Sequence, residues 1–207
     1  MNDKQLNINR VARWISNLFH PWLVLAVIMG LAAYTAARHD GEWVKWALLA
    51  VLLAYLPTMV YAGIRTASLR RAEGNNNSKL SLLRERPRDL LVAAFLFGFP
   101  AVPALYILGT PRNILMVVMA ATVTMIAVAL VNMKYRASFH IALLTCALFS
   151  LWFLVGTLSI VSILLIPLLA LSRWRLSEHT AGQLAMGFAL GATITPGVFC
   201  VLGMASA

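Results

Sequence analysis

Three short polar segments carry the residue types that phosphate chemistry needs. They are Lys79–Pro87, Arg136–His140 and Ser172–Gln183. Together they supply lysine and arginine side chains, whose cationic groups neutralise phosphate oxygens. They also supply two histidines, and a neutral histidine can attack phosphorus while a second protonates the departing oxygen. If the fold brings the three segments together, they offer the groups of a phosphoryl-transfer site.

Seven apolar runs flank and separate these segments. A bilayer core about 30 Å thick requires about 20 apolar residues per helix. Gly156-Thr157, between the fifth and sixth runs, predicts a tight hairpin, and these two runs are short. We therefore expect an all-α, polytopic transmembrane helical bundle with six or seven spans. The runs are Leu18–Ala37, Val44–Ile64, Leu90–Leu108, Asn113–Asn132, His140–Val155, Leu158–Leu171 and Thr180–Met204.

The composition agrees with a membrane protein and argues against nucleic-acid binding. Hydrophobic residues make up 61% of the 207 residues and charged residues only 12%, whereas a soluble domain averages about 25% charged residues. The excess of 17 Lys and Arg over 7 Asp and Glu would suit nucleic acid only on a soluble basic face. Here the cations lie in short loops between apolar runs, where membrane phospholipids or a lipid phosphate are the expected partners.

The basic residues also predict the orientation of the bundle. With seven spans, one side of the membrane receives 14 Lys and Arg and the other receives three, namely Arg38, Lys45 and Arg112. The positive-inside rule then places the N-terminus and all three polar segments on the cytoplasmic side of the cell inner membrane. We expect a cytoplasmic amphipathic N-terminus (1–17), two N-terminal transmembrane helices (18–64) and a transmembrane core that carries the polar segments (65–207).

The three segments resemble the signature of the type 2 phosphatidic acid phosphatase superfamily, which includes membrane lipid phosphatases and vanadium haloperoxidases. That signature is Lys-x6-Arg-Pro, then Pro-Ser-Gly-His, then Ser-Arg-x5-His-x3-Asp. The resemblance covers about residues 79–192. The matching residues, in the family's order, are Lys79, Arg86, Pro87, Ser138, His140, Ser172, Arg173 and His179.

The resemblance implies a role for each matching side chain. His179 would attack phosphorus and form a phosphohistidine, and His140 would protonate the leaving group and then activate water. The phosphoryl oxygens would be held by Lys79, Arg86, Arg173, Ser138 and the backbone N–H of Phe139. That mechanism requires no metal and no other cofactor, because the cations stabilise the transition state.

Three positions depart from the family's signature. Gln183 stands where the family has aspartate, Phe139 replaces a glycine and Ala137 replaces a proline. The Gln183 side chain can still accept a hydrogen bond from His179, one helical turn away, but it brings no negative charge. In a serine protease, replacing the orienting aspartate by its amide lowers turnover by about 10⁴. The departures therefore predict slow turnover or a narrower site.

We expect an integral membrane, metal-independent phosphatase that hydrolyses a lipid phosphate or diphosphate, such as a phosphatidate or a polyprenyl diphosphate. Two alternatives remain open. One is a catalytically weak or inactive relative that binds lipid phosphates, which Gln183 and Phe139 favour. The other is a structural or transport subunit, in which the loop cations only set the topology. The sequence does not determine the oligomeric state.

Two further pairs of residues have structural interpretations. His20 and His39 have no partners in this scheme, and we expect both to be structural. Gly187 and Gly191 form a small-xxx-small pair, which indicates close packing of two membrane helices.

Overall fold

The computed structural model describes residues 10–204, with the exception of 12, 15, 40 and 74–85. Every regular element in this part of the chain is a helix, so the predicted all-α class is confirmed. The elements are α2 (Pro21–Ala37), α3 (Trp43–Glu73), α5 (Pro87–Gly98), α6 (Ala101–Ile107), α7 (Arg112–Val131), α8 (Phe139–Val155), the 3₁₀ helix η1 (Thr157–Leu164), α9 (Leu165–Arg175) and α10 (Ala181–Met204).

Four helical stretches in the described residues are long and apolar enough to cross a membrane. The helices α2 and α8 are also apolar but shorter, at 17 residues each. Length and composition therefore indicate a membrane protein with four candidate spans among the described residues, and the predicted count of six or seven spans is not confirmed. The four stretches are Trp43–Leu69, Pro87–Ile107, Arg112–Val131 and Ala181–Gly203.

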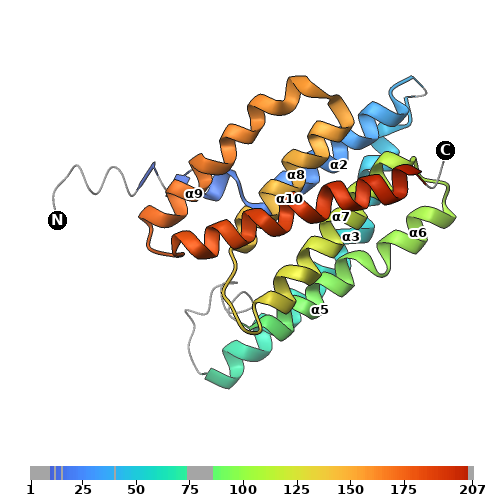
Figure 1. Cartoon of the computed structure of the whole chain (residues 1–207). Helices are drawn as coiled ribbons and strands as arrows, with labels where there is room; N and C mark the ends of the chain where they lie inside the picture. The colour runs from blue at the N-terminus through green and yellow to red at the C-terminus, as the bar shows by residue number, and fades with distance from the viewer. Residues whose placement is uncertain (1–9, 12, 15, 40, 74–85, 205–207) are drawn as a thin grey trace.

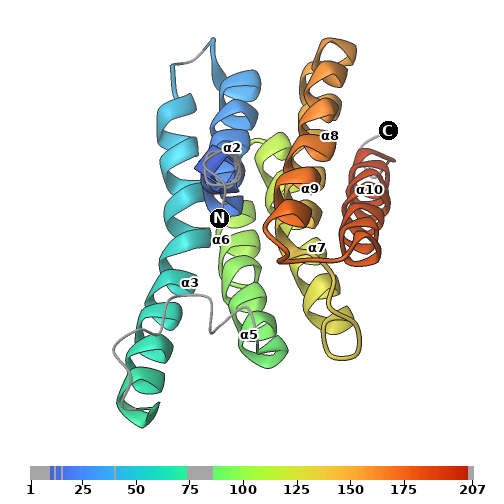
Figure 2. The ribbon, with the colours of Figure 1, turned by 90° about the vertical axis from the view of Figure 1, so that its left-hand side faces the viewer.

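The helices form one bundle around α7 (Figure 1). α7 packs against α2, α5, α8 and α10, and in Figure 2 it lies between α3 at one edge of the bundle and α10 at the other. The main apolar core joins α2, α3, α5, α7 and α8. A second apolar cluster joins α8, α9 and the start of α10, so the two polar segments that contain histidine adjoin the same cluster.

Glycine allows α10 to approach α8 closely. A Cβ atom added to Gly187 would lie 2.5 Å from the backbone oxygen of Ser138, and one added to Gly191 would lie 2.5 Å from that of Ala142. Because real Cβ atoms do not approach backbone so closely, only glycine fits at these two positions. The small-xxx-small pair therefore packs the helix that follows His179 against the helix that contains His140.

Several element boundaries follow from single residues. α8 ends at Gly156, whose φ of 86° is readily adopted only by glycine, and the chain then reverses into η1. This is the hairpin predicted at Gly156-Thr157. α3 is longer than its apolar run, which ends at Ile64, because the helix continues to Glu73 through basic residues.

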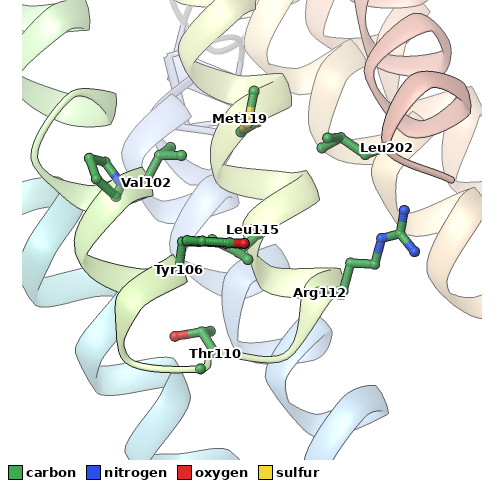
Figure 3. A pocket seen from close by; sticks show the side chains of 9 residues that line it. Val102, Tyr106, Thr110, Arg112, Leu115, Met119 and Leu202 are labelled. Atoms are coloured by element: carbon green, nitrogen blue, oxygen red, sulfur yellow. The ribbon is translucent and has the colours of Figure 1, made fainter. Parts of the chain in front are cut away.

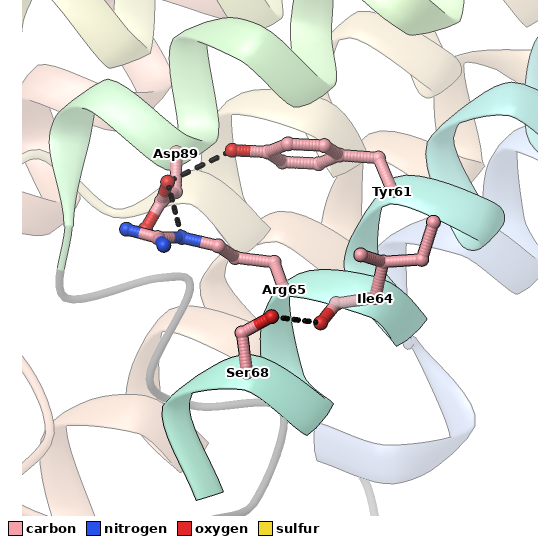
Figure 4. A network of polar contacts seen from close by, with 5 residues as sticks. All are labelled: Tyr61, Ile64, Arg65, Ser68 and Asp89. Atoms are coloured by element: carbon pink, nitrogen blue, oxygen red, sulfur yellow. Dashed lines mark hydrogen bonds and ion pairs between the residues drawn. The ribbon is translucent and has the colours of Figure 1, made fainter. Parts of the chain in front are cut away.

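A buried carboxylate joins this extension of α3 to the start of α5. The Oδ1 atom of Asp89 accepts hydrogen bonds from the Tyr61 hydroxyl at 2.8 Å and from Nε of Arg65 at 3.1 Å (Figure 4). Asp89 lies in the first turn of α5, where the helix dipole favours a negative charge. The network therefore fixes the start of α5 against α3.

Candidate functional site

The first part of the site is the start of α8. Ser138 is the N-cap residue of this helix, yet its side chain makes no capping hydrogen bond. Its hydroxyl is fully buried and has no hydrogen-bond partner among the described residues. The preceding loop is held by the Asn132 side chain, whose Oδ1 accepts the N–H of Ala137 at 2.6 Å. A buried hydroxyl at a helix N-terminus is a favourable environment for an anion.

The second part is the turn that leads into α10. The predicted hydrogen bond between His179 and Gln183 is present, with 3.0 Å between Nδ1 and Oε1. The same Oε1 accepts the backbone N–H of Thr180 at 3.2 Å, and the Thr180 hydroxyl accepts the N–H of Gln183 at 3.4 Å. This reciprocal arrangement is a capping box. Its sequence pattern, Thr180-x-x-Gln183, is a signal that the sequence analysis missed.

The capping box also fixes the chemistry of His179. Because Oε1 of Gln183 accepts the N–H of Thr180, the atom facing His179 is an oxygen and Nδ1 must donate to it. A neutral His179 therefore carries its proton on Nδ1 and a lone pair on Nε2. That is the tautomer in which Nε2 can act as a nucleophile.

Gln183 joins these two parts of the site. Its backbone oxygen accepts the N–H of Ser138 at 3.0 Å, while its side chain holds His179. Close packing continues next to it, because a Cβ on Gly182 would lie 2.7 Å from the hydroxyl of Tyr135. The fold thus brings the second and third polar segments into direct contact.

Arg173, at the end of α9, is almost completely buried, with 2% of its surface exposed. Its Nη1 donates to the Ser16 hydroxyl at 3.0 Å, and its Nη2 forms an ion pair with Glu178. A buried guanidinium requires such partners, because an uncompensated charge is costly inside a protein. An incoming phosphate could take the place of the Glu178 carboxylate.

Local backbone geometry brings Glu178 to Arg173. Ser177 follows the end of α9 with a φ of 55°, in the left-handed region. The N–H of Ser177 bonds to the oxygen of Trp174, and that of Glu178 bonds to the oxygen of Arg173. These are the two bonds of a Schellman motif. The motif turns Glu178 back toward the end of α9, where it pairs with Arg173.

His140 is buried in the first turn of α8, with 3% of its surface exposed. Its ring contacts the ring of His20 edge-on, with 5.8 Å between the centroids and 84° between the planes. Sequence analysis leaves His20 without a partner, whereas the structure places it against a predicted site residue. The neighbouring Phe139 packs into the main core, 6.4 Å from the Trp22 ring.

Of the site residues predicted in the first polar segment, only Arg86 is among the described residues. Arg86 is the N-cap residue of α5, and its side chain is exposed. Lys79 lies outside the described residues. The described contacts therefore connect the second and third segments, together with Ser16 and His20, which sequence analysis missed because both precede the signature and lie far from it in the chain.

A pocket of about 620 Å³ lies elsewhere in the bundle (Figure 3). It is lined by Tyr106, by Arg112 at the start of α7 and by Leu202 near the end of α10. The candidate site instead follows the end of α7 and includes the start of α10, so the pocket lies at the opposite end of these two helices. None of the predicted site residues that the structure describes lines it.

Comparison of the chain with models of protein families, with curated proteins and with solved structures gives no match. Within the described residues, no group of three or more His, Cys, Asp or Glu side chains gathers where it could hold a metal ion.

Proposed function

We propose that this protein is an integral membrane phosphatase that hydrolyses a phosphate or diphosphate ester of a lipid. The main support is the position of Gln183, which belongs to the segment of His179 and also contacts the segment of His140. Its backbone oxygen binds the N–H of Ser138, and its side chain binds Nδ1 of His179. One residue thereby couples the predicted nucleophile to the helix that carries His140, the predicted acid.

In the proposed reaction, Nε2 of His179 attacks phosphorus and the bond from phosphorus to the lipid oxygen breaks. The departing oxygen takes a proton from the imidazolium of His140. His140 then removes a proton from water, and the water oxygen attacks the phosphohistidine. The phosphorus–nitrogen bond breaks, which releases phosphate and restores both histidines.

The charges around the site support binding of the phosphoryl group. Arg173 carries a buried positive charge, and the Ser138 hydroxyl and the N-terminus of α8 lie on the segment joined to Gln183. Such preorganised donors stabilise the charge of a transition state better than water does. Binding of phosphate would replace one anionic partner of Arg173, Glu178, by another.

The substrate class follows from the setting of the site. The site lies at the start of the apolar helices α8 and α10, so a substrate with a lipid tail can remain in the bilayer while its headgroup meets the polar residues. Phosphatidate-like lipids and polyprenyl diphosphates both satisfy this requirement. We propose that the site faces the cytoplasm across the cell inner membrane, an orientation that the excess of basic residues favours under the positive-inside rule.

The direct test is phosphate release by the purified protein in detergent, from phosphatidate and from a polyprenyl diphosphate, in the presence of EDTA. We expect release by the wild type, loss of release in His179→Ala and normal release in His39→Ala, which alters an exposed histidine outside the site. A folded wild type that releases no more phosphate than His179→Ala would refute hydrolysis of these lipids.

A second candidate function is binding of lipid phosphates without turnover. Two observations favour it: Gln183 offers His179 no negative charge, and Glu178 already neutralises Arg173. Such a protein would bind vesicles that contain phosphatidate, lose this binding in Arg173→Gln and leave the phosphate ester intact. Measuring binding and release on the same samples separates the two functions.

A further inference from the structure

The chain that precedes α2 contacts two residues of the candidate site. Ser16 is buried, and its hydroxyl lies 3.0 Å from Nη1 of Arg173. Four residues later, the ring of His20 lies edge-on against the ring of His140. The segment Ser16–His20 therefore touches both the buried cation and the predicted acid, although it is distant from both in the sequence.

This segment is anchored, so its side chains have defined positions. His20 is the N-cap residue of α2, and Pro21 occupies the first position of that helix, where its fixed φ favours helix initiation. The N–H of His20 bonds to the oxygen of Asn17 at 3.2 Å. Between them, Phe19 packs against the apolar cluster that joins α8, α9 and α10. The segment is thus fixed to the helices that carry the site.

We infer that Ser16 and His20 are positioning residues of the phosphate site. The Ser16 hydroxyl accepts a hydrogen bond from one nitrogen of the Arg173 guanidinium. The guanidinium therefore keeps its orientation when phosphate replaces Glu178. His20 restricts rotation of the His140 ring. Groups held in place before binding lose less entropy when the ligand arrives. This inference rests on the proposed function, which assigns Arg173 and His140 to the phosphoryl group.

The test is the affinity of the full-length protein in detergent for inorganic phosphate, measured by calorimetry. We expect binding to Ser16→Ala to be roughly tenfold weaker, because a hydrogen bond to a charged group is lost. Ser68→Ala is the matched control, since Ser68 is exposed and its hydroxyl donates to the backbone oxygen of Ile64 in its own helix. Ser16→Thr retains the hydroxyl and should retain affinity for phosphate. Ser16→Val has the shape of threonine but no hydroxyl, and it should bind phosphate more weakly.

The role of His20 is tested by the same measurement of phosphate affinity. His20→Ala should weaken phosphate binding several-fold, while His20→Phe, which retains a ring against His140, should remain close to the wild type. His39→Ala is the control. Thermal unfolding of every variant identifies any loss that arises from a change in stability alone, and the comparisons are made between variants with equal melting temperatures.

The outcomes separate this inference from the proposed function. If Ser16→Val and His20→Ala bind phosphate as tightly as the controls, the positioning roles are wrong, whether or not the wild type hydrolyses lipids. If both bind weakly and the wild type releases no phosphate from lipids, the positioning roles stand and the enzymatic proposal fails. A wild type that binds no phosphate overturns the positioning roles, whereas the enzymatic proposal is decided separately by release of phosphate from lipids.

Discussion

The side-chain oxygen of Gln183 lies 3.0 Å from Nδ1 of His179 and 3.2 Å from the backbone nitrogen of Thr180. One amide oxygen therefore caps α10 and orients the imidazole. The phosphatase signature proposed from the sequence has aspartate at this position, where a carboxylate would also stabilise the positive charge that develops on the ring. The Gln183 amide keeps the hydrogen-bond geometry but provides no negative charge.

Restoring the charge should accelerate the proposed reaction. We expect Gln183→Glu, which keeps the side-chain length and the capping box, to raise kcat for phosphate release by about tenfold or more. Gln183→Leu should abolish release, because it removes the acceptor for both His179 and Thr180. A Gln183→Glu protein that folds but has an unchanged kcat would show that charge at this position does not limit the rate.

Removing the competing carboxylate should favour phosphate. Glu178 pairs with the buried Arg173 guanidinium, so Glu178→Gln should lower the KM for a lipid phosphate several-fold, because the ligand no longer displaces a charged partner. Glu42→Gln breaks an exposed ion pair with Lys45 and serves as the control. A higher KM in Glu178→Gln would mean that the carboxylate supports binding instead of competing with it.

The contact between α8 and α10 should tolerate no added methyl group. We expect Gly187→Ala to lower the free energy of unfolding by about 1–3 kcal/mol, because the new Cβ forces the Ser138 backbone away. Gly197 is on the same helix and has no atom within 4 Å of an added Cβ, so Gly197→Ala should leave the melting temperature nearly unchanged. Equal melting temperatures for the two variants would contradict the described packing.

The Asp89 network should affect stability more than chemistry. Asp89→Ala leaves the Tyr61 hydroxyl and the Arg65 guanidinium without their shared acceptor, and a loss of about 1–3 kcal/mol in unfolding free energy is expected. Thermal unfolding in detergent measures this loss, with Ser68→Ala as the control. The kcat of Asp89→Ala should stay near that of the wild type, and a large fall in kcat would place this network in the reaction.

The proposed orientation is open to a labelling experiment. In a background with Cys146→Ser and Cys200→Ser, single cysteines are introduced by Met133→Cys and Glu42→Cys. An impermeant thiol reagent applied to intact cells should label Glu42→Cys and leave Met133→Cys unlabelled, because the positive-inside rule predicts that Met133 faces the cytoplasm. The reverse pattern would move the proposed site to the outer face of the membrane.

Much of the fold and part of the site are local properties that the sequence alone determines. Continuous apolar runs predict helices because a bilayer leaves no other partner for the backbone. Five of the seven predicted runs correspond to one α-helix each, whereas the third is divided into α5 and α6 and the sixth into η1 and α9. Gly156 ends α8 because its φ suits glycine. The bond between His179 and Gln183 joins residues one helical turn apart, so spacing alone predicts it.

The rest depends on the rotation and packing of helices, which no local pattern encodes. The contacts of Ser16 with Arg173, of His20 with His140 and of Ser138 with Gln183 each join distant parts of the chain. The pairing of Glu178 with Arg173 depends on a left-handed serine, Ser177, where a sequence pattern would call for glycine. The sequence supplied the chemical groups, and tertiary packing decided their partners, because each contact exists only when several helices dock in one relative orientation.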